Sequence, residues 1–390
     1  MPKKLVFIAQ FPVDYQISIY NSCTKIFDVH VIFLSDFGLE NAFDPEFGDS
    51  IKRFNKDRMW NFTSHFLRNA SFKNNGSFFA HKKVSHLFLL RKLRPDFVVV
   101  QGYYSFSEML AIVFGKMIAG GSFVLKGESV LPSTKSNQNY LSKGIKERLK
   151  QSVLKLILQR VEKVIYFSQK NKEFWLNYGA NSKKLFWAPC VADAHKYLTA
   201  PTNNMQMELN HFSDTVTSRV VKVGFIGRLI ARKRILETIQ YFPKSDKYQL
   251  FIAGSGKLHK EIESYLEKYR IQNVKLLGPL QQDTLFEFIN QIDVGILLSS
   301  VDPSPKVLNE FLDLGVPCII SGDVGTAHEL IKDDISGYVV DQLSAHSIRK
   351  ALEKIIEKDF FKNDDIFKNH ISAWSGKNWA DCFSKAMLND

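Results

Sequence analysis

An apolar segment, a polar loop, a short amphipathic stretch and a second apolar segment follow one another between residues 294 and 320. Residues 294–298 are apolar throughout, which predicts a buried parallel strand. A Pro-rich loop leads into a helix that contains Glu310, and Gly315 ends this helix before a second strand at residues 316–320. The loop therefore lies at the carboxyl end of a strand, where ligands bind in open α/β sheets, and the helix start beside it favours a phosphate.

The first half of the chain repeats this alternation. Apolar segments separated by helical patterns predict a doubly wound parallel sheet. Residues 36–75 are rich in Asn, Asp and Phe and predict a long irregular loop. The expected strands are residues 5–9, 29–34, 97–100, 122–125 and 163–167, and the expected helices are residues 17–27, 106–118 and 144–160.

The length of 390 residues predicts two domains. We expect an N-terminal domain at residues 1–200 and a polar linker without periodicity at residues 201–218. A second domain follows at residues 219–373, and the segment 374–390 is predicted to be a last helix.

Several properties of the sequence limit where the protein can be located and what it can bind. No apolar run reaches the ~20 residues that span a bilayer, and the apolar core at residues 5–8 is too short for a signal peptide. Four scattered cysteines predict a reducing cytoplasm. The net charge of +12 fits polyphosphate substrates or an anionic membrane surface. Nucleic acid is the weaker option, because zinc-finger and RRM motifs are absent.

The second domain opens with a strand at residues 221–226 that ends in a glycine turn. Arg228 and Lys233 flank this turn, and two fixed cations at a helix start suit a diphosphate whose charge grows as a sugar bond breaks. The G-x-G-x-x-G fingerprint of dinucleotide sites is absent.

Three motifs resemble glycosyltransferase family 4, a retaining family with the GT-B fold. Asp302 and Glu310 match its acidic-x7-acidic signature, although the first acid is usually Glu. Residues 309–317 match its N-E-x-x-x-x-G-x-P run, and residues 227–233 match its G-R-L-x-x-x-K motif. The resemblance implies two Rossmann-like domains facing a cleft and metal-independent transfer of a hexosyl group without a cofactor.

The resemblance also implies roles for residues. Arg228 and Lys233 would stabilise the departing diphosphate, Glu310 would hold the ribose and Asp302 would orient the sugar. Pro305-Lys306 replaces the family's usual Gly and apolar residue. The expected nucleotide-sugar site comprises Gly227, Arg228, Lys233, Gly254, Pro305, Lys306, Val307, Glu310 and Thr326.

The first domain would bind the acceptor. Segments after its strands resemble loops of bacterial cell-surface polysaccharide glycosyltransferases, among them residues 44–48. Glu128 stands where many members carry a His, and we include it with the catalytic group of Asp302, Arg228 and Lys233. The expected acceptor residues are Tyr15, Gly102, Tyr103 and Glu128.

Other interpretations remain open. A nucleotide-sugar epimerase or a phosphorylase would keep the fold and change the reaction. A non-catalytic basic module would bind anionic membranes or nucleic acid instead. Residues 143–163 form a basic amphipathic helix that either lies on a membrane or packs on the core with a solvated basic face. The preferred partners are a nucleotide sugar and a glycan or lipid-linked saccharide at the inner membrane face.

Overall fold

The structure is a computed structural model. It describes residues 1–36, 42–44, 49–51, 60–67, 78, 84–131, 144–191, 220–280, 282–358 and 364–388. The chain divides into two compact units. The first comprises Met1–Pro45, Asp49–Val191 and Trp374–Asp390, and the second comprises Glu46–Gly48 and Ala192–Ala373. The expected linker, residues 201–218, lies outside the described residues.

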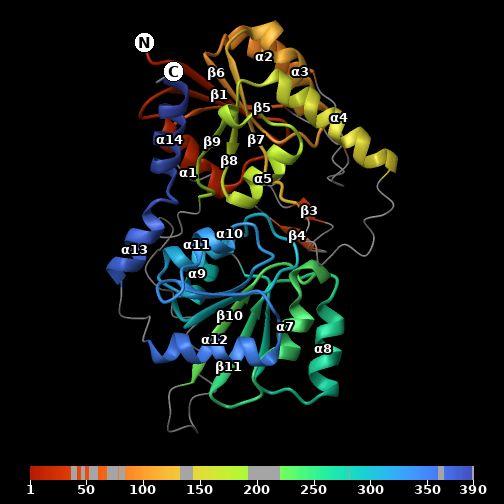
Figure 1. The fold of residues 1–390 in the computed structure, drawn as a ribbon, viewed down its shortest axis with the longest axis vertical. Coiled ribbons are helices and arrows are strands. Elements are labelled where there is room, and N and C mark those ends of the chain that lie inside the picture. Colours follow the sequence, from red (N-terminus) through yellow and green to blue (C-terminus); the bar gives the residue numbers. More distant parts are fainter. Residues whose placement is uncertain are drawn as a thin grey trace. The chain divides into compact units, whose positions relative to one another are not determined.

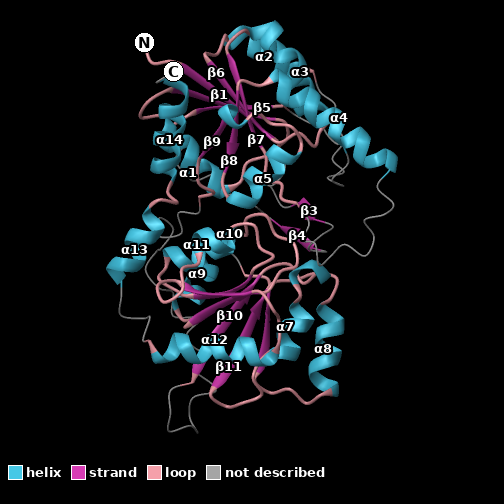
Figure 2. Cartoon of the chain, viewed as in Figure 1, coloured by secondary structure: helices cyan, strands magenta, loops and turns pink. Residues whose placement is uncertain are grey.

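A seven-stranded sheet forms the centre of the first unit (Figures 1 and 2), with all of its strand pairs parallel. Its strand order is β5-β2-β1-β6-β7-β8-β9. The direction of winding changes between β1 and β6, which makes this the topological switch point of the sheet. The strands are β1 (Lys4–Ala9), β2 (Asp28–Phe33), β5 (Thr63–Phe66), β6 (Phe97–Gln101), β7 (Ser122–Lys126), β8 (Lys163–Tyr166) and β9 (Leu185–Trp187).

Helices cover both faces of this sheet, because its strands are apolar on both sides. Alternate residues of β1 enter two separate cores: Leu5 and Phe7 belong to one, and Val6 and Ile8 to the other. The first core includes side chains of α1 and α14, and the second includes side chains of α2, α3, α4 and α5. These helices are α1 (Asp14–Cys23), α2 (Ser85–Leu93), α3 (Phe106–Ala119), α4 (Gly144–Arg160), α5 (Gln169–Asn177) and α14 (Gly376–Leu388).

The C-terminal helix α14 is part of the first unit although the sequence between residues 192 and 373 precedes it. It packs beside α1 (Figure 1). Trp379 is fully buried, with its ring centroid 5.8 Å from that of Phe7 and 5.3 Å from that of Phe383. The last segment of the chain thereby completes the core on one face of the first sheet.

The expectation of an irregular loop over residues 36–75 is wrong in part. The edge strand β5 lies within it and pairs in parallel with β2. The short strands β3 (Ala42–Asp44) and β4 (Asp49–Ile51) also lie there and pair antiparallel. Stacking of Phe66 on Phe33 and of His65 on His30 favours the β5 pairing, and these long-range contacts are invisible in the local sequence pattern.

The second unit contains a six-stranded parallel sheet with the order β12-β11-β10-β13-β14-β15. Its switch point lies between β10 and β13. The strands are β10 (Val221–Ile226), β11 (Tyr248–Ala253), β12 (Val274–Gly278), β13 (Val294–Leu297), β14 (Cys318–Ser321) and β15 (Gly337–Val340). The helices are α7 (Ile235–Tyr241), α8 (His259–Lys268), α9 (Gln282–Asn290), α10 (Lys306–Asp313), α11 (Ala327–Leu330), α12 (Ala345–Glu357) and α13 (Asp364–Ser372).

The predicted strand–helix–strand step at residues 294–320 is confirmed as β13, α10 and β14, with the second strand starting two residues later than expected. The glycine turn after β10 differs from the expectation. A short 3₁₀ turn, Ala231–Lys233, precedes α7, and Arg234 joins them with a φ of 50°. Among the described helices, none is both long enough and apolar enough to cross a bilayer.

Replacement of Trp379 by alanine tests the contribution of α14 to the first unit. Removing a fully buried tryptophan should lower the free energy of unfolding by about 3–5 kcal/mol. All five tryptophans of the chain lie in the first unit, so tryptophan fluorescence during urea unfolding reports on that unit. The control Leu388→Ala, at a position on α14 that is 37% exposed, should change the free energy by less than about 0.5 kcal/mol. Equal effects of the two variants would contradict the packing role of α14.

Candidate functional site

The carboxyl ends of β10, β11, β13 and β14 meet at one edge of the second sheet, because all strand pairs in this sheet are parallel. The segments after these strands contain nearly every predicted nucleotide-sugar residue. The switch point between β10 and β13 lies at the centre of this edge, where open α/β sheets bind ligands.

Two glycines after β10 and β11 allow the backbones of neighbouring turns to approach closely. Gly227 donates its N–H to the carbonyl of Ala253 at 3.0 Å. Gly254 has a φ of 143°, and a Cβ at this position would collide with the carbonyl oxygen of Gly227. Only glycine fits at residue 254. The turns after β10 and β11 therefore present backbone atoms without a side chain at this position, near Arg228.

Lys233 and Asp302 form a buried ion pair between the segments that follow β10 and β13. Lys233 Nζ donates a short hydrogen bond to Asp302 Oδ2. The two side chains are only 9% and 10% exposed. An unpaired buried charge is costly, so each of the two side chains offsets the burial cost of the other. Lys233, which is predicted to bind the diphosphate, and Asp302, which is predicted to orient the sugar, therefore contact one another directly.

Arg228 lies half-buried at the start of the same turn. Burial and the neighbouring Arg232 lower the pKa of its guanidinium, whereas Asp302 opposes this shift. Arg232 donates to the carbonyl of Val301 at 3.3 Å, and Arg234 donates to Asp323 Oδ2 at 2.9 Å. The turn after β10 thus concentrates positive charge next to the loops after β13 and β14.

The loop that carries Asp302 is held by the loop after β14. Gly325 donates its N–H to the carbonyl of Asp302 at 2.7 Å, and Asp302 forms an isolated parallel bridge with Val324. The next residue, Thr326, is fully buried, and its hydroxyl has no hydrogen-bond partner among the described residues. A buried hydroxyl of this kind can bond a ligand at this edge.

Helix α10 begins directly after this loop, at Lys306. Pro305 is buried and serves as its N-terminal cap residue, without a side-chain capping hydrogen bond. The first turn of an α-helix directs backbone N–H groups out of the helix start. Lys306 Nζ lies 3.4 Å from Ser304 Oγ. Glu310 lies one turn further along the same helix face as Lys306. The geometry therefore combines anion-binding N–H groups with a carboxylate one turn away.

A separate pocket of about 380 Å³ lies at the switch point of the first unit. The segments after β1, β6 and β7 form its walls. Of the predicted acceptor residues, Tyr15, Gly102 and Glu128 line this pocket, and Tyr103 does not. The full lining is Ala9, Gln10, Phe11, Val13, Tyr15, Gln16, Gln101, Gly102, Tyr104, Lys126 and Glu128.

Tyr103 is instead part of the structure behind the pocket. It is 9% exposed, and its hydroxyl lies 2.7 Å from Ser129 Oγ. Its ring stacks against that of Tyr104 with centroids 4.3 Å apart. Burial raises its pKa, so the hydroxyl stays protonated. The neighbouring Tyr104 presents the ring that lines the pocket, and the sequence analysis missed it.

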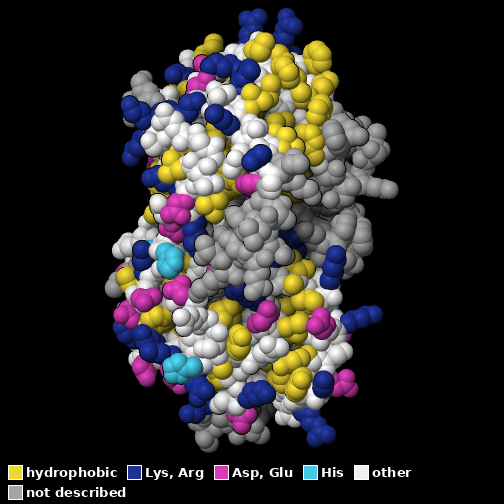
Figure 3. Space-filling view, turned by 45° about the vertical axis from the view of Figure 1, so that its right-hand side comes forward, with side chains coloured by type: hydrophobic (Ala, Val, Ile, Leu, Met, Phe, Trp, Pro, Cys, Tyr) yellow, Lys and Arg dark blue, Asp and Glu magenta, His cyan; other side chains and the backbone are white. Residues whose placement is uncertain are grey.

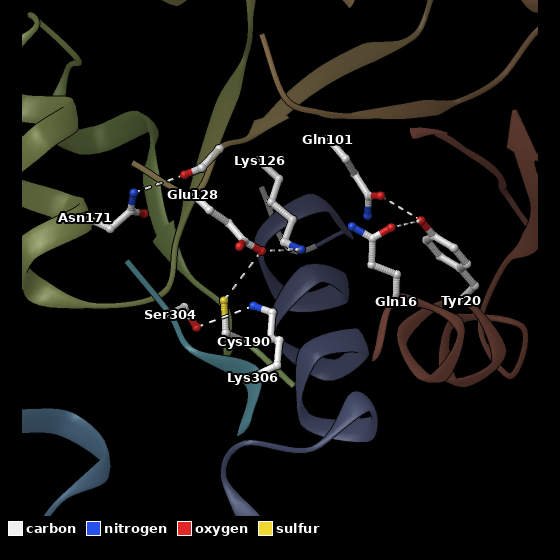
Figure 4. Close-up of polar contacts among 10 residues, drawn as sticks. Gln16, Tyr20, Gln101, Lys126, Glu128, Asn171, Cys190, Ser304 and Lys306 are labelled. Atoms are coloured by element: carbon white, nitrogen blue, oxygen red, sulfur yellow. Dashed lines mark hydrogen bonds and ion pairs between the residues drawn. The ribbon is translucent and has the colours of Figure 1, made fainter. Parts of the chain in front are cut away.

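Lys126 also lines this pocket, and the sequence analysis assigned it no role. Its side chain is 5% exposed, and its ammonium lies 3.7 Å from Glu128 Oε1 (Figure 4). Asn171 holds the following loop by donating to the carbonyls of Gly127 and Ser129 at 3.0 and 2.6 Å. The signal in the sequence was the lysine itself, because a lysine that ends an otherwise apolar strand lies at the ligand-binding edge of a sheet.

Glu108 supports the floor of the pocket without lining it. Its buried carboxylate accepts hydrogen bonds from Gln10 Nε2 at 3.0 Å and from the N–H groups of Tyr104 and Ser105 at 2.9 Å. Burial raises its pKa, and these hydrogen bonds oppose the shift. A side chain on Gly102, whose φ is 132°, would clash with this carboxylate. Glu108 therefore positions the segments after β1 and β6.

A buried tyrosine fixes Gln101, one of the glutamines that line the pocket. The Tyr20 hydroxyl donates to Gln101 Oε1 at 2.6 Å and lies 3.0 Å from Gln16 Oε1 (Figure 4). Tyr20 is fully buried, and burial is the main cause that raises its pKa. Gln101 is therefore held in place opposite Lys126 in the parallel register.

No group of three or more His, Cys, Asp or Glu side chains suited to a metal ion occurs in the described ranges. Metal independence remains a prediction. The predicted loop at residues 44–48 lies largely outside the described residues.

The comparisons with known proteins agree with this geometry. Residues 207–372 match the family model of the glycosyl transferases group 1. An uncharacterized glycosyltransferase of Methanocaldococcus jannaschii is 29% identical over 42% of this chain and 43% of the relative. A Campylobacter jejuni enzyme is 31% identical over 40% of this chain and 45% of the relative. Its name is GalNAc-alpha-(1->4)-GalNAc-alpha-(1->3)-diNAcBac-PP-undecaprenol alpha-1,4-N-acetyl-D-galactosaminyltransferase. The matched part thus spans less than half of each of these relatives.

Solved structures match over nearly the whole chain. HepE of Anabaena in complex with UDP has a TM-score of 0.70 at 14% identity, covering 99% of this chain and 100% of that one. The lipopolysaccharide outer core galactosyltransferase WaaB has a TM-score of 0.65 at 14% identity, with 99% of both chains covered. The predicted GT-B fold of two Rossmann-like domains is therefore confirmed. The similarity to the glycosyl transferases group 1 is confined to residues 207–372, which fall in the second unit.

A double-mutant cycle tests the buried pair in the second unit. Lys233→Met or Asp302→Asn alone should lower the free energy of unfolding by about 3–5 kcal/mol, because each leaves its partner buried and unpaired. The double variant should lose much less than the sum of the two. Far-UV circular dichroism follows both units, and tryptophan fluorescence, which reports on the first unit, serves as the internal reference.

A matched control is the exposed pair of Lys116 and Glu162, whose side chains are 57% and 30% exposed. Lys116→Met should cost less than about 1 kcal/mol. Additive effects of the Lys233 and Asp302 changes would mean that the two charges do not depend on each other.

Proposed function

We propose that this protein is a retaining glycosyltransferase of family 4. It moves a hexosyl group from a nucleotide-diphosphate sugar to a glycan or lipid-linked saccharide in cell-surface polysaccharide synthesis. The observation that carries the proposal is the cluster of Arg228, Lys233 and Asp302 at the switch point of the second sheet. This cluster lies within the segment that matches the group 1 glycosyl transferases.

Arg228 and Lys233 bind the diphosphate of the donor. As the bond between the sugar and the phosphate breaks, negative charge grows on the leaving diphosphate, and fixed cations in a partly buried site stabilise that charge. The N–H groups at the start of α10 add partial positive charge. Glu310 accepts hydrogen bonds from the ribose hydroxyls.

In this proposal, donor binding changes which group balances the charge of the buried Lys233 ammonium. Without donor, Asp302 compensates the buried ammonium of Lys233. When a diphosphate supplies that negative charge, Asp302 is released to accept a hydrogen bond from the donor sugar. We propose front-face attack by the acceptor hydroxyl, with the leaving phosphate taking its proton, and no metal ion or cofactor in this reaction.

The pocket of the first unit binds the acceptor in this proposal. It lies at the carboxyl ends of parallel strands and combines aromatic walls with a few polar groups, which is the usual composition of a small-molecule site. The Campylobacter jejuni relative carries an undecaprenol-linked saccharide in its name, which supports a lipid-linked acceptor for this chain.

A lipid-linked acceptor places the protein at the cytoplasmic face of the membrane. Helices α2, α3 and α4 expose apolar side chains, of which Phe88 is 70% and Met117 76% exposed, and Figure 3 shows hydrophobic side chains gathered on this part of the first unit. Exposed cations of α2 and α4 accompany them, and this combination favours an anionic bilayer surface. These cations are Arg91, Lys92, Arg148, Lys155 and Arg160.

Vesicle sedimentation tests the membrane proposal. The wild type should bind vesicles that contain anionic phosphatidylglycerol and dissociate at high salt, because surface charges are screened. The double variant Phe88→Ser and Met117→Ser should bind more weakly. Tyr269→Ser, which changes a residue that is 51% exposed in the second unit, should bind like the wild type. Equal binding to neutral and anionic vesicles would contradict the role of charge.

Calorimetry with UDP-, GDP-, ADP- and dTDP-sugars tests the donor site. One nucleotide should bind tightly to the wild type. Glu310→Ala and Arg228→Ala should each weaken that binding at least about tenfold, since a hydrogen bond to a charged group contributes roughly 1.5–3 kcal/mol. The control Glu261→Ala changes an exposed glutamate of α8 and should bind like the wild type.

Transfer assays on Arg228→Ala and Lys233→Ala test the proposed reaction, and further observations separate it from its alternatives. Arg228→Ala and Lys233→Ala should reduce the transfer rate by about 10²–10³, the usual cost of losing a group that stabilises developing charge. Unchanged turnover in both would exclude the mechanism. An epimerase would convert the nucleotide sugar with no acceptor present. A non-catalytic module would bind none of the nucleotides.

A further inference from the structure

Lys126 is a mostly buried lysine that lines the pocket of the first unit. Its side chain is 5% exposed, and its ammonium lies 3.7 Å from Glu128 Oε1. This distance exceeds that of a hydrogen bond. A ligand in the pocket that supplies acceptor oxygens can therefore take hydrogen bonds from this ammonium.

The backbone places Lys126 and its neighbours around one cavity. Lys126 is the last residue of β7 and lies opposite Gln101, the last residue of β6, in the parallel register. Both side chains line the pocket of about 380 Å³. Glu128, two residues further, is 31% exposed. A cation therefore lies deep in the pocket, and a carboxylate lies nearer to solvent.

We propose that Lys126 and Glu128 together bind hydroxyl groups of an uncharged hexose unit of the acceptor. This inference rests on the proposed function, since it names the acceptor class of the same reaction. A sugar hydroxyl is both a donor and an acceptor of hydrogen bonds. Lys126 donates to a hydroxyl oxygen, and Glu128 accepts the proton of the same or a neighbouring hydroxyl.

The balance of charge in the pocket selects against acidic sugars. The ammonium and the carboxylate cancel, so the pocket offers no net attraction to an anion. The carboxylate of a uronic acid would pass Glu128 before it reached Lys126, and like charges in a partly buried site repel. Glu128 thereby acts as a specificity-determining residue.

The remaining walls fit the same ligand. The aromatic residues Phe11, Tyr15 and Tyr104 and the amide-bearing residues Gln10 and Gln16 line the pocket. Apolar rings suit the C–H faces of a hexose, and neutral amides bond its hydroxyls without favouring a charge. The Tyr20 hydroxyl fixes the amide of Gln101, which also lines the pocket, so this part of the site is preorganised.

Binding of methyl glycosides to the full chain tests the inference. Saturation-transfer NMR titrations would compare methyl glucoside, methyl galactoside, methyl N-acetylgalactosaminide and methyl glucuronide. The wild type should bind at least one uncharged glycoside about tenfold more tightly than the glucuronide. Lys126→Met should weaken that binding about tenfold or more, and Lys126→Arg, which keeps the donors and the charge, should retain part of it.

Glu128→Gln provides the discriminating variant. It removes the negative charge and keeps the size of the side chain, so the preference for uncharged over acidic glycosides should shrink or reverse. The control Lys183→Met changes an exposed lysine of the first unit and should bind every glycoside like the wild type. Melting curves of all variants confirm that each is folded.

The outcomes separate this inference from the proposed function. Tighter binding of the glucuronide by the wild type, an unchanged affinity in Lys126→Met, or an unchanged preference in Glu128→Gln would overturn the inference. So would nucleotide-sugar binding without binding of any glycoside, although the proposed function would then stand. Glycoside binding with these variant effects but without nucleotide-sugar binding would support the hydroxyl site and overturn the transferase.

Discussion

The buried ion pair of Lys233 and Asp302 is the interaction on which the candidate donor site depends. It joins the segments that follow β10 and β13, the two strands on either side of the switch point. A buried ammonium needs a negative charge nearby, and a diphosphate can supply the same charge as Asp302. Without a ligand, the Asp302 carboxylate balances the charge of the Lys233 ammonium. If the carboxylate turned away, the buried ammonium would need another anion. Lys233 can thus remain buried, where the low dielectric strengthens its effect on a leaving group.

Parallel sheets explain why residues far apart in the sequence form these sites. The carboxyl ends of all strands in such a sheet lie at one edge, so single residues after successive strands gather there. In the second unit this edge collects Arg228, Gly254 and Asp302. In the first unit it collects Tyr15, Gln101 and Lys126. Each site is thereby built from strand ends that the core holds rigidly in place.

Much of this arrangement was predictable from the sequence, because strand–helix alternation and glycine turns are local signals. The strands β1, β2, β6, β7, β8 and β13 lie within about two residues of their predicted positions, and α10 contains Glu310 and ends before Gly315 as predicted. The edge strand β5 was missed, since its pairing depends on Phe66 and His65 meeting side chains of β2. The choice between Tyr103 and Tyr104 also needed coordinates, because the direction of adjacent side chains in a loop follows no period. The contact between Lys233 and Asp302 joins residues far apart in the chain, and the motifs alone assigned them separate ligands.

The two candidate sites differ in their charge, and this difference follows from what each would bind. The second unit gathers Arg228 and Arg232 beside the ion pairs Lys233–Asp302 and Arg234–Asp323, which leaves a positive surplus for a diphosphate. The first unit sets one cation, Lys126, against one carboxylate, Glu128, with neutral amides around them. A positive surplus in the acceptor pocket would attract free nucleotide diphosphates, which would then compete with the acceptor. A neutral pocket with both donors and acceptors avoids that competition and retains affinity for hydroxyl groups. In the proposed function, this electrostatic contrast would help to keep donor and acceptor in separate sites.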